Sequence, residues 1–216
     1  MNQKPFIIIV GRTATGKTTL AKALGEKGLT RVITHTTRPR RESEFENDYH
    51  FVDDVTKYEN RVLETVINNH QYFMTRESLA EHDVLILDPK GAKEFVTLNP
   101  TMRPCLLVYL YVDAETRLSY YITRDSNNQL NGNDFMNHLE STHEKFHERN
   151  DSESSLFDEY ERYILGVPEH IGCRHLVFLN EDTDYMVSQI QKQCQNGSKF
   201  FTRFTRDSKQ LTLWED

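Results

Sequence analysis

The stretch GRTATGKT, residues 11–18, decides how the chain folds. It matches the pattern G-x-x-x-x-G-K-[ST] in full, follows the apolar run Phe6–Val10 and precedes a helix-like segment at Lys17–Lys27. In such a strand–loop–helix arrangement the glycines let the backbone turn so tightly that successive N–H groups point at phosphate oxygens, at the positive end of the helix. The motif therefore predicts a site for a nucleoside triphosphate.

The side chains of this loop have distinct expected roles. Lys17 places a positive charge on the phosphate that is transferred, and the Thr18 hydroxyl is a ligand for Mg²⁺, the cofactor that we expect. The residues expected to bind the phosphates of ATP are Gly11, Thr13, Ala14, Thr15, Gly16, Lys17, Thr18 and Thr19.

Apolar runs alternate with amphipathic segments along most of the chain, which predicts an α/β fold. The expected strands are residues 6–10, 31–34, 84–87, 106–112 and 176–179. The expected helices are residues 17–27, 56–68, 91–98, 114–123, 134–148 and 183–194. This alternation is typical of a mostly parallel sheet that is covered by helices on both faces, a three-layer fold.

Composition excludes several classes of protein. Of the 216 residues, 37% are hydrophobic and 27% charged, and no apolar run approaches the ~20 residues of a membrane-spanning helix. The first residues lack the apolar core of a signal peptide, and the three cysteines share no CxxC spacing, so we expect a cytoplasmic protein. The net charge of −7 argues against broad nucleic-acid binding but leaves a small anionic ligand open.

A second charged stretch predicts another phosphate site. It reads TTRPRRESE at residues 36–44 and continues as DYHFV at residues 48–52. The guanidinium groups of Arg38 and Arg41 are forks of donors that suit a phosphate monoester, and the Tyr49 hydroxyl can complete the cage. A solvated charged loop is the alternative interpretation.

With both motifs, the sequence resembles guanylate kinase, a P-loop family of nucleoside monophosphate kinases. The family pattern T-T-R-x-x-R-x-x-E followed by D-Y-x-F-V lies at residues 36–52, and the resemblance continues through residues 63–64, 72–75 and 85–91. It implies a P-loop kinase fold with a small excursion for the monophosphate at about residues 35–82 and a lid at about 124–150. These parts would belong to one domain, 1–195, followed by a C-terminal appendage, 196–216.

The resemblance also implies which residues bind the acceptor. These are Thr34, Arg38, Arg41, Tyr49, Glu64, Thr75 and Asp88. A carboxylate at Glu64 would accept the paired N1–H and N2–H₂ donors of guanine and repel the N1 lone pair of adenine. Two positions depart from the family. Phe73 stands where a second tyrosine is usual, so one phosphate hydroxyl would be missing, and Met74 replaces a glycine and would crowd the pocket.

The lid is expected to bring arginines over the transferred phosphate. Arg117 and Arg124 lie seven residues apart on one helical run, hence on one face, although surface charges are the alternative interpretation. A further family arginine has no counterpart between Asp125 and Glu148, and we expect Lys145 or Arg149 to substitute for it. Asn180, after the last strand, is expected beside the adenine or as a strand cap.

The expected function is transfer of the γ-phosphoryl group of ATP to a nucleoside monophosphate or its deoxy form, GMP or dGMP first, with no nucleic acid or membrane as partner. Two alternatives stay open. One is a related P-loop kinase that acts on another phosphorylated acceptor, and the other is a noncatalytic guanylate-kinase-like binding module.

Overall fold

The computed structural model describes residues 4–40, 49–67, 69–98, 101, 103–125, 132–166, 173–179 and 181–195. The central sheet contains β1 (Phe6–Gly11), β6 (Val84–Ile86), β7 (Cys105–Tyr111) and β8 (Cys173–Leu179). The strand order is β6-β1-β7-β8 and each neighbouring pair is parallel. The carboxyl ends of all four strands therefore meet at one edge of the sheet, where α/β folds place their ligands.

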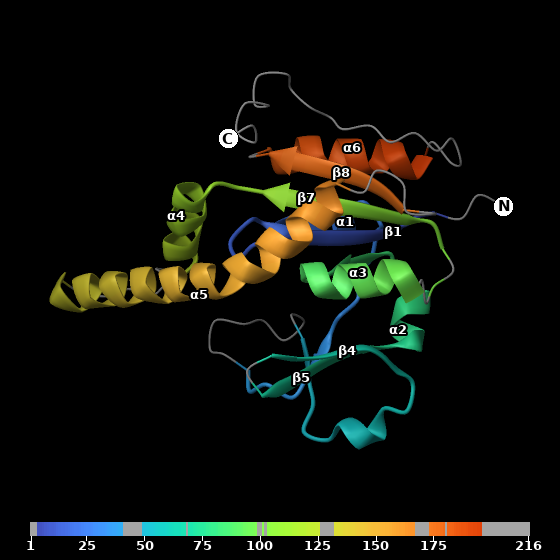
Figure 1. Ribbon diagram of the computed structural model, residues 1–216, viewed down its shortest axis with the longest axis horizontal. Coiled ribbons are helices and arrows are strands. Elements are labelled where there is room, and N and C mark those ends of the chain that lie inside the picture. The colour runs from blue at the N-terminus through green and yellow to red at the C-terminus, as the bar shows by residue number, and fades with distance from the viewer. Residues whose placement is uncertain are drawn as a thin grey trace.

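Helices cover both faces of this sheet (Figure 1). They are α1 (Lys17–Glu26) and α6 (Thr183–Gln195) on one face and α3 (Pro89–Leu98) and α5 (Gly132–Gly166) on the other. A three-layer α/β fold with a parallel sheet, as expected from the alternation in the sequence, is confirmed.

The alternation of side chains along β1 builds both hydrophobic cores. Phe6, Ile8 and Val10 are fully buried in the core that includes α3 and α5. Ile7 and Ile9 are fully buried in the core that includes α1 and α6. Successive side chains of a strand point to opposite faces, so a run that is apolar at every position predicts a strand covered on both sides.

A second, smaller sheet forms the excursion that the sequence predicts after Thr34. Its strands are β2 (His35–Thr36), β3 (His50–Phe51), β4 (Arg61–Ile67) and β5 (His70–Thr75). They lie in the order β3-β2-β5-β4, beside a short 3₁₀ turn, η1 (Val55–Lys57), and α2 (Arg76–Glu81). Figure 1 shows this sheet below α3, apart from the central sheet.

The predicted helix at residues 56–68 is wrong, because residues 61–67 form strand β4. The pairing of β4 with β5 shifts register between Val62 and Thr65, and Leu63 has a φ of +53°. Such a bulge inserts one extra residue into a strand. The extra residue gives the apolar residues of β4 the spacing of one face of a helix, and this spacing explains why the sequence pattern indicates a helix.

Two other predicted boundaries are also wrong. The expected strand at residues 31–34 contributes one isolated bridge, between Arg31 and Val84, and the strand itself begins at His35. The expected helix at 134–148 extends to Gly166 as the 35-residue helix α5. The preceding helix, α4 (Ala114–Asp125), matches its prediction. Residues 126–131 of the expected lid and the C-terminal appendage, 196–216, lie outside the described residues.

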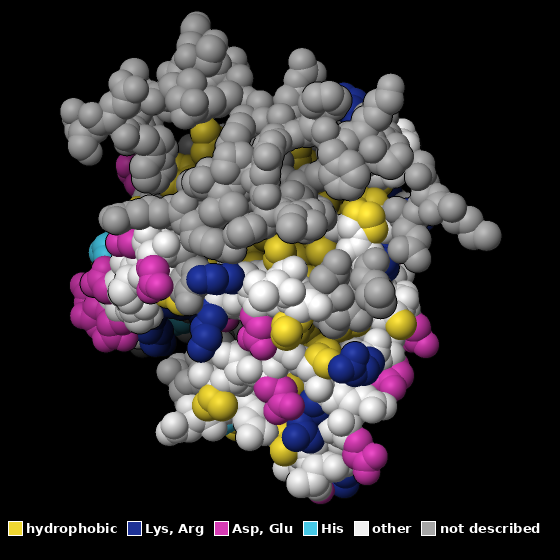
Figure 2. Space-filling model, turned by 45° about the vertical axis from the view of Figure 1, so that its right-hand side comes forward, with side chains coloured by type: hydrophobic (Ala, Val, Ile, Leu, Met, Phe, Trp, Pro, Cys, Tyr) yellow, Lys and Arg dark blue, Asp and Glu magenta, His cyan; other side chains and the backbone are white. Residues whose placement is uncertain are grey.

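Among the described residues, no helix combines the length and the apolar character needed to cross a membrane. On the face drawn in Figure 2, the described Lys and Arg side chains lie scattered among Asp and Glu side chains.

Candidate functional site

The loop between β1 and α1 has the backbone geometry that its glycines predict. Ala14 and Gly16 adopt left-handed conformations, with φ values of +62° and +84°. A Cβ atom at Gly11 would lie 2.6 Å from the hydroxyl oxygen of Thr15 and 2.8 Å from the carbonyl oxygen of Leu110. Only glycine fits there, because the end of β1 lies close to Leu110 of the neighbouring strand β7 and to Thr15 of the loop.

Lys17, the first residue of α1, folds back over this loop. Its ammonium group donates hydrogen bonds to the carbonyl oxygens of Gly11, at 2.7 Å, and Arg12, at 2.6 Å. Burial lowers the pKa of Lys17 to about 8, while the nearby Glu153 carboxylate opposes this shift. The lysine thus presents a charge that is poorly solvated and available to an anion.

A carboxylate from α5 lies on the other side of the loop. The Thr13 backbone N–H donates to Glu153 Oε2 at 2.9 Å, and the Thr13 hydroxyl donates to Glu153 Oε1. Arg149, one turn earlier on α5, donates from Nε to the same Oε1 at 3.0 Å. These hydrogen bonds keep the pKa of Glu153 below its ordinary value although burial acts in the opposite direction, so the residue is an anion bound to the loop.

Two more arginines tie the loop to its surroundings. The Arg12 guanidinium pairs with Asp158 of α5 at 3.0 Å and lies 5.0 Å from the centre of the Phe157 ring. Arg117 is buried and donates to Val112 O at 3.0 Å and to Asn150 Oδ1 at 2.7 Å. Burial lowers the pKa of Arg117, and the surface interpretation of this arginine is wrong.

The remaining residues that are expected to bind ATP differ in their burial and contacts. Thr15 is buried and donates to Arg12 O at 2.9 Å, whereas Thr18 and Thr19 are exposed in the first turn of α1. Arg124 is exposed with its guanidinium 4.8 Å from the centre of the Tyr121 ring, and it acts electrostatically on Lys17. Asn180 lies outside the described residues.

The second sheet gathers an arginine and aromatic side chains into the expected cage. Arg38 donates from Nε to the Tyr72 hydroxyl at 3.2 Å. Its guanidinium lies 5.4 Å from the centre of the Tyr49 ring and 5.7 Å from that of Phe51. Arg41 lies outside the described residues. The structure thus brings together Arg38 and Tyr49 and adds Tyr72, which sequence reasoning missed.

Strand register explains why Tyr72 takes this place. Tyr72 pairs with Thr36 on β2, while Phe73 pairs with His35 and so faces the opposite side of the sheet. A second hydroxyl beside Arg38 is therefore present, although Phe73 stands at the usual tyrosine position. Met74 is buried in the hydrophobic core that contains Leu63 rather than crowding the cage.

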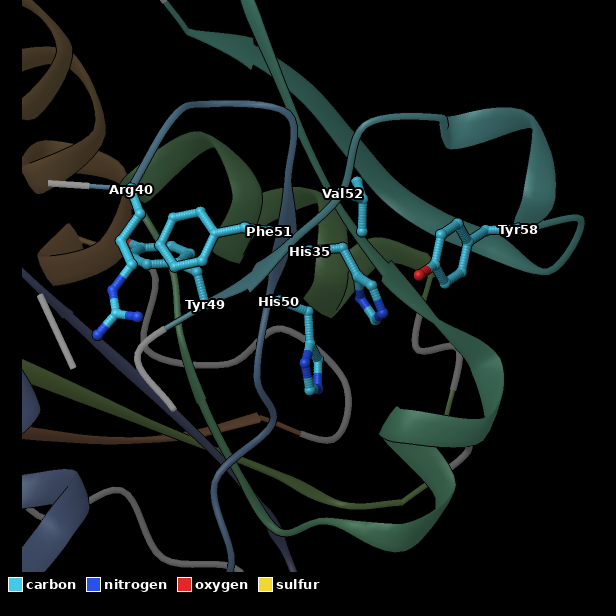
Figure 3. Close-up of a pocket in the computed structure, with 7 residues that line it drawn as sticks. All are labelled: His35, Arg40, Tyr49, His50, Phe51, Val52 and Tyr58. Carbon is cyan, nitrogen blue, oxygen red and sulfur yellow. The ribbon is translucent and has the colours of Figure 1, made fainter. Parts of the chain in front are cut away.

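A pocket of about 600 Å³ lies around β3, one of the two edge strands of the second sheet in the described part of the chain. It is lined by His35, Arg40, Tyr49, His50, Phe51, Val52 and Tyr58 (Figure 3). The imidazole rings of His35 and His50 lie side by side, with ring centres 4.8 Å apart. Arg40, Tyr49 and Phe51 lie at the other end of the pocket, which joins it to the cage around Arg38.

His35 is the buried histidine of this pocket, whereas His50 is exposed. It is 8% exposed, its Nδ1 atom has no hydrogen-bond partner, and its ring stacks on Phe73 with centres 4.9 Å apart. Burial, followed by the proximity of His50, lowers the pKa of His35 to about 4. The folded protein therefore keeps this imidazole neutral.

The free energy of unfolding should fall by about 1 to 2 kcal/mol as the pH drops from 6.5 to 4, because the unfolded chain protonates His35 before the folded protein does. The contribution is complete above pH 6.5 and is lost as the pH falls through this window. Urea denaturation at several pH values measures it, and His35→Phe should flatten the profile. The exposed His143→Phe is the control. If the pH dependence of the free energy of unfolding is the same in His35→Phe as in wild type, other groups cause it.

The residues expected to read the base lie on four different segments. Glu64 is 51% exposed and pairs with Arg61 at 3.2 Å. The Thr75 hydroxyl accepts from the Ser78 N–H at 3.2 Å and so caps α2. Asp88 follows β6 and accepts from the Gly91 N–H at 2.7 Å, in the first turn of α3. Thr34, just before β2, is half-buried.

Comparison with known proteins places the chain in a family. A protein-family model described as "AAA domain" matches residues 7–153, which is more than half of the chain. The chain belongs to this AAA domain family. The matched region of the AAA domain includes the phosphate-binding loop, the second sheet and the part of α5 that contacts Thr13.

Individual relatives extend this result. The chain is 32% identical over 126 residues to the guanylate kinase of Coxiella burnetii (strain RSA 493 / Nine Mile phase I). This alignment covers 51% of this chain and 59% of that protein. The chain therefore spans less than two thirds of that relative. The resemblance of this AAA domain to guanylate kinases, expected from its motifs, is confirmed.

One solved structure supports the fold. The AAA domain resembles the crystal structure of guanylate kinase from Anaplasma phagocytophilum with a TM-score of 0.50 and 18% identity, over 91% of this chain and 88% of that one. It is less similar to deoxyadenosine kinase from M. mycoides with bound dCTP, with a TM-score of 0.33 and 14% identity over 88% and 98% of the two chains. The first likeness confirms the P-loop kinase fold.

Proposed function

We propose that the chain transfers the γ-phosphoryl group of ATP to a nucleoside monophosphate, with GMP or dGMP preferred. The observation that carries the proposal is the presence of two separate anion sites in one fold. The first is the loop around Lys17, and the second is the cage formed by Arg38, Tyr49 and Tyr72. A hydrolase needs the first site alone, whereas a kinase with a phosphorylated acceptor needs both.

On the triphosphate side, the amides of the loop and Lys17 would hold the phosphates. Arg117, Arg124 and Arg149 all act electrostatically on Lys17 and so lie close enough to share in neutralising the transferred group. α4 and α5, which carry these arginines, would form the lid. We propose that Arg149 takes the place of the family arginine for which the sequence offers Lys145 or Arg149.

Magnesium fits the donors of this site. The Thr18 hydroxyl is exposed at the start of α1, next to Lys17. Within the described ranges, no group of three or more His, Cys, Asp or Glu side chains could hold a metal ion. Mg²⁺ commonly binds through few protein groups, substrate phosphates and water. Thr18 would hold the ion, which would supply charge neutralisation at the phosphates.

On the acceptor side, the substrate is itself an anionic phosphate and needs no strong general base. Arg38, Tyr49, Tyr72 and Arg41 would fix its orientation, so that its oxygen attacks in line. Positioning and charge neutralisation are the main sources of catalysis in phosphoryl transfer. Thr34, Glu64, Thr75 and Asp88 are the groups that we propose for the base.

An ADP-release assay with Mg-ATP and each nucleoside monophosphate tests the proposal. We expect the highest kcat/KM with GMP or dGMP. Turnover with another phosphorylated acceptor alone would favour a related P-loop kinase. Calorimetric binding of Mg-ATP without turnover on any acceptor would favour a noncatalytic binding module, and absence of ATP binding would contradict the proposed function altogether.

Glu64→Gln should reduce the preference for GMP over AMP by about tenfold. A neutral amide offers one donor and one acceptor, so it accepts guanine less well and no longer repels the N1 lone pair of adenine. The ratio of kcat/KM values for the two acceptors measures the change. Glu59→Gln, an exposed acid of the same excursion, should leave the ratio unchanged. An unaltered ratio in Glu64→Gln would show that Glu64 serves only its pair with Arg61.

A further inference from the structure

The phosphate-binding loop already holds an anion that belongs to the chain itself. The Glu153 carboxylate takes one hydrogen bond from the Thr13 N–H and one from the Thr13 hydroxyl. A carboxylate bound by a backbone amide and a hydroxyl satisfies the same donors that a phosphate oxygen would satisfy. Any anion that needs these two donors must therefore replace the Glu153 side chain.

The position of Thr13 in the loop indicates which phosphate is affected. The helix α1 begins at Lys17, after Gly16, and the amides at that end point at the inner phosphates. Thr13 lies before the turn formed by Ala14 and Gly16, on the far arm of the loop. Lys17 reaches the outer phosphates, and Glu153 is the group that acts on it with opposite charge. The Glu153 carboxylate thus lies toward the terminal phosphate.

Electrostatics favours a carboxylate at this place. Arg149 Nε lies 3.0 Å from Glu153 Oε1, and Arg117 Nη1 lies 3.4 Å from the Thr13 carbonyl oxygen. Besides burial, the charges of these two arginines and of Arg124 lower the pKa of Lys17. Like charges so close together repel one another in a poorly solvated site. Glu153 counters them, and its side chain is only 18% exposed.

We propose that Glu153 is a stand-in for the terminal phosphate of a nucleoside triphosphate and determines specificity for the length of the phosphate chain. ATP must displace this carboxylate from Thr13, whereas ADP, which ends one phosphate earlier, leaves it in place. Once displaced, Glu153 leaves Arg149 beside the incoming phosphate. This inference rests on the proposed function, because it assigns a role within the proposed ATP site.

A purely structural role for Glu153 makes a different prediction. α5 is also tied to the loop by the pair between Arg12 and Asp158 and by the hydrogen bond from Arg12 to Ser154 at 3.2 Å. If Glu153 served only to hold α5 against the loop, its loss would loosen the loop and weaken the binding of both ATP and ADP. If Glu153 instead occupies the place of the terminal phosphate, its loss should strengthen the binding of ATP and leave the binding of ADP almost unchanged.

Calorimetric titration of the full chain with Mg-ATP and with Mg-ADP separates these cases. In Glu153→Ala we expect the Kd of ATP to fall by about five- to tenfold, because ATP then replaces no internal anion and relieves unopposed positive charge. The Kd of ADP should change less than twofold. Glu159→Ala, which removes an exposed carboxylate from the same helix, should change neither value.

Each other outcome contradicts the inference in a specific way. Equal tightening of ATP and ADP would overturn the assignment to the terminal phosphate, and unchanged or weaker ATP binding would overturn the stand-in itself. If Glu153→Ala fails to fold by circular dichroism, Glu153→Gln is titrated instead, with a smaller shift in the same direction and the same readings of a null or opposite result. Failure of the wild-type chain to bind ATP would contradict the proposed function rather than this step.

Discussion

Lys17→Ala should lower kcat/KM for phosphoryl transfer by at least ~10²-fold, or about 2.7 kcal/mol, comparable to the loss of one preorganised donor at a developing charge. The structure supplies the reason. The ammonium group is poorly solvated and bound to two loop carbonyls, so anionic phosphate oxygens are better partners for it than these neutral oxygens. Steady-state kinetics with saturating Mg-ATP and the best acceptor measures the loss.

The matched control is Lys22→Ala, which removes an exposed lysine from the same helix. It should retain wild-type turnover. Thermal unfolding should show that Lys17→Ala remains folded, because Lys17 belongs to the loop and not to the two cores around β1. Turnover within threefold of wild type in a folded Lys17→Ala protein would refute the role assigned to this residue.

Arg38→Ala should raise the dissociation constant of the monophosphate by about 10- to 150-fold, since a charge-assisted contact to phosphate contributes ~1.5 to 3 kcal/mol. The affinity for ATP should hardly change, because Arg38 lies in the second sheet with Tyr49 and Tyr72 rather than in the loop after β1. Calorimetry with each nucleotide alone measures both affinities.

Two variants define the source of that effect. Arg76→Ala, which removes an exposed arginine from α2 in the same region, should leave both affinities unchanged. Tyr72→Phe keeps the ring beside Arg38 and loses only the hydroxyl that accepts from Nε, so its effect should be smaller than that of Arg38→Ala. A larger loss of ATP affinity than of monophosphate affinity in Arg38→Ala would disprove the cage as an acceptor site.

The central sheet could be predicted from the sequence because its strands are covered on both faces. Every residue of β1 from Phe6 to Val10 is fully buried, and such a run has few alternatives to a parallel strand. β4 could not be predicted, because a bulge is set by pairing with β5 across the sheet. The local pattern around Leu63 contains the extra residue but not the partner that makes it a bulge.

The candidate site likewise has a part that could be predicted from the sequence and a part that could not. The loop and the Arg38 cage are encoded in contiguous motifs, so their residues could be named in advance. The Glu153 contact is not, because Thr13 and Glu153 are 140 residues apart and nothing in the sequence near either one announces the other. Tyr72 was missed for a reason of register, since a shift of one residue moves a side chain to the other face of the sheet.

The length of α5 would turn the proposed exchange of anions at Thr13 into a larger movement. Glu153 lies 21 residues after the first residue of this 35-residue helix, Gly132, a lever arm of about 30 Å at 1.5 Å per residue. A tilt of about 10° around the contact with Thr13 would carry the beginning of the helix through about 5 Å, by the geometry of a straight rod. Entry of one phosphate at the loop would thus be amplified mechanically at the far tip of the molecule.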